Sequence, residues 1–320
     1  MTVAAGQQRQ AKRAGVLAAA LIALAIALPA TAQAAPKAAS AYYVRNTTVS
    51  GLNSTLYTWG CNFAKAHPNT DQLAIIDFGQ PTKIGPGTYG ALDFNTTNPT
   101  VFSNAEILTA LENFADGHHN CYIQGTTTIS LGVNNYHISS SLGSEADATN
   151  DGYYIGQRSA QLGSYESSHG YNRQSYGGAI DLELDWQGPI YSTDWTNGFN
   201  NYANQYASGD FYYDYGDAAG CPPYGSCNNG WSVPKVYNVA WGILHAESVP
   251  EIYYSGNGHE WTNIAGYNGS SGLAYWDGAT GEISSASGHL TPSESWTTLN
   301  NDMIAAGHSG IGNYLPCFGC

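Results

Sequence analysis

Three acidic residues, Asp181, Glu183 and Asp185, alternate with aliphatic residues in the run 178–186. Alternate side chains of a β-strand point to opposite faces, so this spacing predicts that the three carboxylates share one face. Carboxylates about 7 Å apart along a strand repel one another, which raises the pKa of at least one of them. A protonated acid beside an ionised carboxylate is the pair that glycoside hydrolysis requires, so this is a candidate catalytic strand. The alternative is a half-buried edge strand whose acids simply face water.

Further acidic, amide and aromatic residues follow other strand-like runs, at the ends where barrel enzymes place their sites. Asp77 ends the first such run and is a fourth candidate catalytic residue. The candidate substrate-binding residues are Asn135, Tyr136, Trp186, Asp214, Tyr215, Trp241 and Tyr253. Each has a structural alternative, because acids and amides are common in turns and aromatic residues are common in cores. Asp214 and Asp217 also leave open a calcium-type oxygen site, although the spacing of an EF-hand is absent.

Motifs for other chemistries are absent from the sequence. There is no Gly-x-Ser-x-Gly nucleophile elbow, no His-Glu-x-x-His zinc motif and no Gly-rich phosphate loop after a strand. The nine histidines lack the spacing of metal ligands and are expected at the surface. We therefore expect neither a metal nor a cofactor.

A barrel of alternating strands and helices would position the candidate residues. Strand-like runs are 73–79, 126–136, 178–186, 211–215, 236–241, 251–254 and 273–276, and helical spacing occurs in 104–118, 154–165, 193–206 and 292–306. Alternation of strand and helix favours parallel strands joined by crossover helices. We predict an α/β protein with one large domain over 49–320, an irregular TIM-like (β/α) barrel, preceded by a flexible leader at 35–48. An open doubly wound sheet is the alternative.

Residues 1–34 have the pattern of a cleavable secretory signal peptide. Basic residues precede an apolar run at 14–28, which is followed by Pro29 and by the small-residue site at 32–34. The apolar run is shorter than a transmembrane helix requires, and no later segment is long and apolar enough to span a bilayer. A retained anchor helix is the alternative. We expect a secreted protein, extracellular or in the cell envelope, with no membrane attachment after cleavage.

Charge and aromatic content agree with export. Removal of the three basic residues of the leader lowers the formal net charge from −14 to −17, and such an acidic surface is a poor partner for nucleic acid. The 24 tyrosines and eight tryptophans are typical of secreted proteins that bind neutral polymers.

Six cysteines, all beyond the signal segment, predict disulfides in an oxidising compartment. The pairing that the positions favour is Cys61–Cys121, Cys221–Cys227 and Cys317–Cys320. Other pairings stay open, as does a redox dithiol at the chain end.

Two groups of known proteins resemble this chain. The runs 73–81, 178–186, 216–223, 241–242 and 250–253 are similar to segments of a set of uncharacterised secreted actinobacterial proteins. That similarity covers most of the chain beyond the signal segment and implies export and a shared fold.

The second, more distant resemblance is to the family 25 glycoside hydrolases, the muramidase lysozymes. Asp181-Leu182-Glu183 resembles the Asp-x-Glu of a middle strand in that family, and Asp77 resembles its first-strand acid. The resemblance implies an irregular barrel with Glu183 as general acid. It also implies that Asp181 or Asp77 orients the acetamido arm of the substrate or stabilises the oxocarbenium-like charge. The run after Asp77 and the additional acid Asp185 depart from the family pattern.

Three functional hypotheses follow. The first is a secreted, monomeric glycoside hydrolase that acts on peptidoglycan or another β-linked polysaccharide by carboxylate acid catalysis. The second is a barrel that binds glycan or cell wall without cleaving it, and the third is a structural exoprotein. A second carboxylate about 5 to 9.5 Å from Glu183 across an open cleft would favour the first hypothesis over the second.

Overall fold

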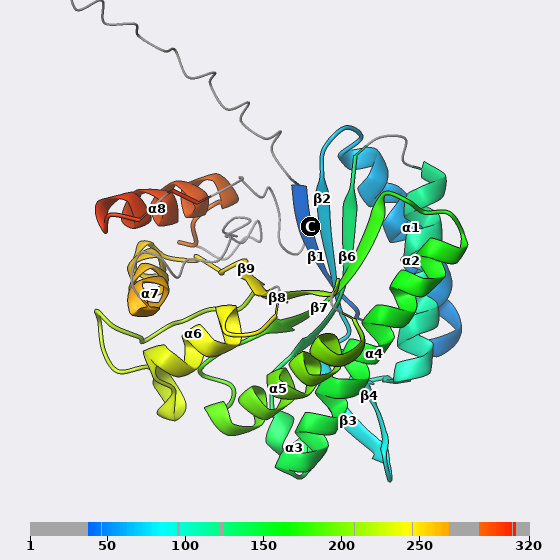
Figure 1. The fold of residues 1–320 in the computed structure, drawn as a ribbon, viewed down its shortest axis with the longest axis horizontal. Helices are drawn as coiled ribbons and strands as arrows, with labels where there is room; N and C mark the ends of the chain where they lie inside the picture. The colour runs from blue at the N-terminus through cyan, green and yellow to red at the C-terminus, as the bar shows by residue number, and fades with distance from the viewer. Residues whose placement is uncertain are drawn as a thin grey trace, which may run out of the picture. The chain divides into compact units, whose positions relative to one another are not determined.

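A parallel β-sheet forms the centre of the fold. The computed structural model describes residues 38–45, 47–94, 97–121, 125–207, 209–244, 246–268, 288–308 and 310–311, so the predicted signal peptide lies outside the described residues. The six strands are β1 (Ala38–Tyr43), β2 (Gln72–Asp77), β6 (Thr127–Asn134), β7 (Gln174–Asp181), β8 (Phe211–Asp214) and β9 (Ala246–Ser248). Each pairs in parallel with the next one in that order (Figure 1).

Helices connect these strands, as a parallel sheet requires. The connecting helices are α1 (Val49–Ala66), α2 (Asn104–Cys121), α3 (Ile138–Leu142), α4 (Glu145–Ser168), α5 (Pro189–Tyr206) and α6 (Val233–Trp241). Two more helices, α7 (Ser255–Ala265) and α8 (Pro292–Ala305), follow β9. Two short 3-10 helices, η1 (Asn228–Gly230) and η2 (Gly266–Asn268), complete the set. The close pair α4 and α5 depends on glycine, since a Cβ on Gly198 would lie 2.0 Å from the backbone oxygen of Thr149.

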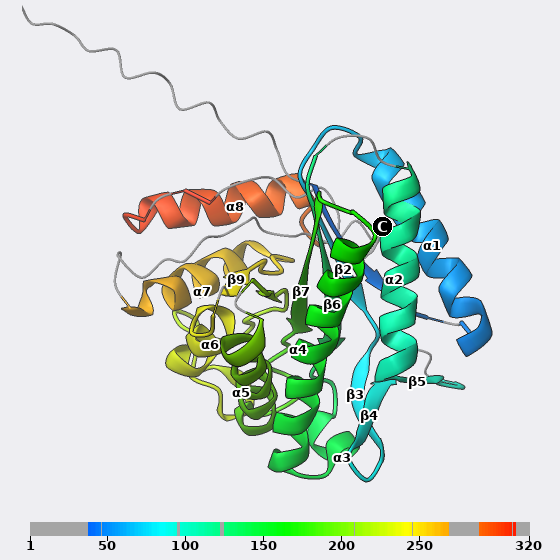
Figure 2. The same ribbon diagram turned by 45° about the vertical axis from the view of Figure 1, so that its right-hand side comes forward.

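A small antiparallel sheet is inserted between β2 and α2. Its strands are β3 (Gln80–Gly85), β4 (Thr88–Leu92) and β5 (Val101–Ser103), paired in that order. In Figure 2, β3 and β4 run toward α3, and the Oγ of Ser141 in α3 donates to the backbone oxygen of Pro81 in β3 at 2.6 Å. The insertion therefore packs at one end of the main sheet.

The two faces of the main sheet have different surroundings. On β2, Ala74 and Ile76 belong to the large core that includes the helices, whereas Leu73 and Ile75 belong to a smaller cluster on the other face. That cluster consists of Ala41, Leu73, Ile75, Ala179, Tyr213, Tyr215 and Val249, which come from or directly follow five of the six strands. The alternation of side chains along each strand explains the separation.

The sheet is strongly curved around the smaller cluster. The hydroxyl of Tyr215, just after β8, donates to Asp77 at the end of β2 at 2.6 Å, although β6 and β7 lie between these strands. Gly132 in β6 makes this contact possible, because a Cβ there would lie 2.9 Å from the Tyr215 hydroxyl. The face opposite the helices is therefore concave.

The predicted α/β class is confirmed, and no closed barrel is present among the described residues. The strand order follows the chain without reversal, so the sheet lacks the switch point of the doubly wound alternative. Consecutive parallel strands with intervening helices are the arrangement of a (β/α) barrel. No pairing joins β9 to β1 within the described parts of the chain, where the six-stranded sheet is open. The predicted strand 273–276 lies outside them.

Three predicted segments have a different structure. Residues 236–241 are part of α6 instead of a strand, because Pro234 is favourable in the first turn of a helix and short apolar runs fit either element. The run 251–254 holds only a bridge at Glu251, and the strand lies just before it, in β9. The predicted flexible leader at 35–48 contains β1, which pairs with β2 along its whole length.

The remaining predicted elements are present. The strands 73–79, 126–136 and 211–215 correspond to β2, β6 and β8, and the four predicted helices correspond to parts of α2, α4, α5 and α8. The strand predicted at 178–186 is β7, but it ends at Asp181, before the other two acids.

Two of the three predicted disulfides are confirmed. Cys61–Cys121 joins α1 to α2, and Cys221–Cys227 closes a loop after β8. Both agree with an oxidising setting. The predicted pair Cys317–Cys320 lies outside the described residues. Across the portion of the chain that the structure describes, no helix has the length and apolarity to cross a membrane.

Candidate active site

Five carboxyl groups gather at the carboxyl ends of the parallel strands, and we refer to them as the acid cluster. Asp77 and Asp181 are the last residues of β2 and β7, and Glu183 follows two residues after β7. Asp217 and Glu251 come from the segments after β8 and β9. Because the carboxyl ends of parallel strands meet at one edge of a sheet, residues far apart in sequence converge here.

The centre of the cluster consists of Asp181, Glu183 and Glu251. One carboxylate oxygen of each residue lies within 4.8 Å of the corresponding oxygens of the other two. The side chain of Glu183 is hydrogen-bonded to those of Glu251 and Asp217. An ionised carboxylate can only accept hydrogen bonds, so contacts between carboxyl groups require protons within the cluster.

Burial and mutual repulsion raise the pKa of the central acids. Burial is the main cause of the raised pKa of Glu183, followed by the charges of Asp217, Asp181 and Glu251. The pKa of Asp181 is also well above its usual range, first because of burial and then because of Glu251 and Asp77. This environment favours the protonated form of a carboxyl group at neutral pH.

Asp77 is held by two donors at the edge of the cluster. The backbone N–H of Gly79 donates to its Oδ1 at 2.7 Å, and the Tyr215 hydroxyl donates to its Oδ2 at 2.6 Å. Burial raises the pKa of Asp77 to about 7, although these two hydrogen bonds and the charge of Arg45 act in the opposite direction. Asp77 is thus the most firmly oriented acid of the cluster.

Tyrosine side chains surround the acids. Tyr253 is hydrogen-bonded to Glu251, and Tyr43, at the end of β1, is close enough for the charges of Asp181 and Glu251 to raise its pKa. Burial is the main cause of the raised pKa of Tyr43, Tyr253 and Tyr215, so all three phenols keep their protons and can donate hydrogen bonds.

Asn135 holds the backbone of Glu183. Its Oδ1 accepts from the Glu183 N–H at 3.1 Å, and its Nδ2 donates to the Glu183 carbonyl at 3.0 Å. Asn135 is completely buried. It was predicted to bind substrate, and the structure places it as a support for Glu183.

An aromatic pair lies at the ends of the neighbouring strands. Tyr136 follows β6 and is 45% exposed, and its ring meets that of Trp186 edge-on with centroids 5.6 Å apart. The next residue, His137, has a φ of 49°, a left-handed conformation that is uncommon outside glycine. The exposed ring of Tyr136 is available to stack on a ligand.

The structure brings five of the predicted site residues together and separates three others. Those that meet are Asp77, Asp181, Glu183, Tyr215 and Tyr253. Asp185 lies in a turn, because β7 has already ended, and its exposed carboxylate accepts from Asn228 at 2.7 Å. Asp214 shares the helix-facing side of β8 with Tyr212, and Trp241 packs in the core against Trp261.

Three residues of the acid cluster and its surroundings were not predicted as catalytic or substrate-binding residues from the sequence. Glu251 lies in the run 251–254, which was predicted as a strand. The feature of the sequence that could have indicated it is the acid within the Pro-Glu-Ile-Tyr segment 250–253. Asp217 was considered only as part of a calcium site with Asp214. Tyr43 lies in the predicted leader, where no signal marked it.

The acid cluster also contains the one set of acids with the spacing of metal ligands within the described ranges. That set is Asp181, Glu183 and Glu251, and it includes neither Asp214 nor Asp217. Oxygen ligands of this kind suit hard cations such as calcium and magnesium. Calcium takes six to eight oxygens, however, and the set offers three carboxyl groups.

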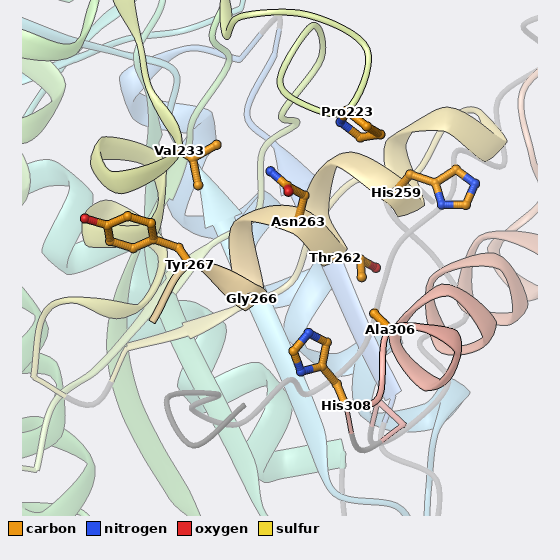
Figure 3. A pocket seen from close by; sticks show the side chains of 9 residues that line it. All are labelled: Pro223, Val233, His259, Thr262, Asn263, Gly266, Tyr267, Ala306 and His308. Atoms are coloured by element: carbon orange, nitrogen blue, oxygen red, sulfur yellow. The ribbon is translucent and has the colours of Figure 1, made fainter. Parts of the chain in front are cut away.

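A pocket of about 460 Å³ lies elsewhere, against α7 (Figure 3). Thr262, Asn263 and His308 are among the residues that line it, and none of the acid cluster does. None of the residues that line this pocket is acidic, so it lacks the carboxyl groups that glycoside hydrolysis requires.

A comparison of the chain with models of protein families found no match, and a search of curated proteins also found none.

Proposed function

We propose that this protein is a secreted glycoside hydrolase that cleaves peptidoglycan or another β-linked polysaccharide. The observation that carries the proposal is the close group of Asp181, Glu183 and Glu251 at the carboxyl ends of the parallel strands, in which Glu183 is hydrogen-bonded to Glu251. Hydrolysis of a glycosidic bond needs one carboxyl group that holds a proton and a second that is ionised. Close carboxyl groups that share protons supply both forms.

In the proposed reaction, Glu183 is the proton donor. Its raised pKa favours the acid form, and its carboxyl proton passes to the glycosidic oxygen as the bond between that oxygen and the anomeric carbon breaks. The positive charge that develops on the sugar ring is stabilised by a neighbouring carboxylate. A water molecule then adds to the anomeric carbon and gives a proton back to Glu183, which completes the hydrolysis. Asp181 suits this role better than Asp77, because its Oδ1 has no hydrogen-bond partner whereas Asp77 is bonded through both oxygens.

The surroundings of the cluster suit a glycan. Tyr43 and Tyr253 supply donors beside the acids, and the exposed ring of Tyr136 can stack on a sugar face. The resemblance of Asp77 and of Asp181-Leu182-Glu183 to the acids of family 25 glycoside hydrolases supports the same reaction class. The confirmed disulfides support export.

The test is the release of reducing sugar from peptidoglycan, chitin and a panel of β-glucans by the mature protein. Glu183→Gln and Asp181→Asn are expected to lower the rate at least about 100-fold, the usual contribution of a general acid. The matched control is Glu145→Gln, which removes a charge from an exposed position in α4. All variants are checked by circular dichroism for folding.

The same assay separates the proposal from its alternatives. Asp185→Asn tests the geometry. Strand alternation would place this acid in the site, whereas in the structure it lies in a turn, so we expect the variant to keep the wild-type rate. Binding of a polymer by wild type and both active-site variants, with no release, would indicate a glycan-binding barrel. Neither binding nor release would favour a structural exoprotein.

A further inference from the structure

We propose that the acid cluster binds a cationic group of its ligand, and that the substrate class is a β-linked glycan with free amino groups. The inference rests on the proposed function, because it names the kind of sugar that the same site takes. It depends on the charge of the cluster and on a buried oxygen that lacks a partner.

The first observation is an unsatisfied acceptor. Asp181 is only 3% exposed, and its Oδ1 has no hydrogen-bond partner. Leaving such an atom unpaired costs about 1 to 3 kcal/mol, so a ligand that donates to it gains affinity. The carboxyl group of Asp181 lies beside those of Glu183 and Glu251, so a ligand that donates to it is brought to the acid cluster.

The second observation is the spacing of the three oxygens. Because they lie within 4.8 Å of one another, a nitrogen between them is no more than about 2.8 Å from each, which is within the reach of an N–H···O hydrogen bond. An ammonium group has three donors and no acceptor, so it can satisfy all three oxygens at once. A sugar hydroxyl has one donor.

The third observation is the excess of carboxyl groups. Two carboxyl groups suffice for hydrolysis, whereas this cluster has five. No basic side chain is among the main influences on Asp181, Glu183 or Asp217, and Arg45 acts on Asp77. Burial and repulsion keep these acids partly protonated, and an ammonium group would stabilise their ionised form and release protons from the cluster. A neutral sugar gives no such stabilisation, whereas the surrounding tyrosine rings also attract cations.

The experiment compares three hexasaccharides of one length and linkage. They are β-1,4-linked hexamers of glucosamine, N-acetylglucosamine and glucose, titrated calorimetrically into wild type and Glu183→Gln at mildly acidic pH, where the amine is charged. We expect the glucosamine hexamer to bind at least about tenfold more tightly than either neutral hexamer. We expect added sodium chloride to reduce that preference.

Asp181→Asn is expected to abolish the preference, so that all three hexamers bind with similar affinity. Should this variant fail to fold, Glu251→Gln provides the same test. Equal binding of all three hexamers, or a preference for a neutral one, would overturn the inference. A parallel titration with calcium chloride covers the metal alternative. Tight calcium binding without a preference for the amine would assign the cluster to a metal ion and overturn the inference as well.

The two proposals fail separately. Cleavage of a neutral hexamer without any preference for the amine would leave the hydrolase standing and remove this inference. A preference for the glucosamine hexamer without cleavage of any of the three would support this inference and count against the hydrolase.

Discussion

Glu166, in the last turn of α4, is a buried acid outside the proposed active site. It is 2% exposed, and neither of its carboxylate oxygens has a hydrogen-bond partner. Burial raises its pKa from 4.5 to about 8. Ionised Glu166 therefore destabilises the folded state, and removal of its charge should stabilise the protein.

The sign and size of the effect follow from the two pKa values. Below about pH 4.5, Glu166 is protonated in both the folded and the unfolded chain, and its charge costs nothing. As the pH rises toward about 8, the unfolded chain loses the proton first, so the free energy of unfolding falls. The full shift corresponds to about 5 kcal/mol. Because water reaches buried charges when a fold relaxes, we expect about 2 to 4 kcal/mol.

The perturbation is Glu166→Gln, which keeps the shape and removes the charge. We expect its free energy of unfolding to match that of wild type near pH 4.5 and to exceed it by about 2 to 4 kcal/mol near pH 8. Urea unfolding at a series of pH values measures the difference. The exposed Glu145→Gln in the same helix is the control, with a small and nearly constant difference. A pH-independent difference for Glu166→Gln, or a loss of stability near pH 8, would refute the reasoning.

Three further predictions concern packing, the site and the disulfides. Gly198→Ala should lower the free energy of unfolding by about 3 kcal/mol in chemical denaturation, because its Cβ would lie 2.0 Å from a backbone oxygen of α4. Gly85→Ala, with nothing within 4 Å of its Cβ, should cost little. Tyr215→Phe removes a hydrogen bond that lowers the pKa of Asp77, so carbon-13 NMR should find that carboxyl titrating above about 7; an unchanged titration would contradict the contact. Cys61→Ser opens a crosslink that spans 60 residues and should lower the free energy of unfolding by about 4 kcal/mol, and a loss under about 1 kcal/mol would show that the crosslink does not constrain the unfolded chain.

The buried strands were predictable because their composition is unambiguous. The runs that became β2 and β6 are apolar and rich in branched residues, and both are buried along nearly their whole length. By contrast, β1 consists of small residues followed by two tyrosines, which carry little strand signal and lie beside a segment that resembles a leader. Its position depends on pairing with β2, and pairing cannot be inferred from the composition of one strand.

The candidate site was predictable where its residues are close in sequence. Asp181 and Glu183 are two residues apart, and their proximity follows from that short separation, although β7 ends at Asp181. Glu251 joins them only because β9 lies two strands away from β7 in a curved sheet. Asp185 shows the limit of the same argument, because alternation holds only as far as the strand continues, and β7 ends at Asp181.

The order of the strands in the sheet has a consequence for how the chain can assemble. Each strand after the first docks on one that precedes it in the chain, so the sheet can grow in the direction of synthesis. The longest stretch of chain between two neighbouring strands separates β2 from β6, and it contains the small antiparallel sheet and α2. When the chain leaves a narrow channel amino end first, each strand can thus cover the exposed edge of the preceding strand as soon as it emerges. It does not have to keep a partly built sheet exposed until its carboxyl end arrives.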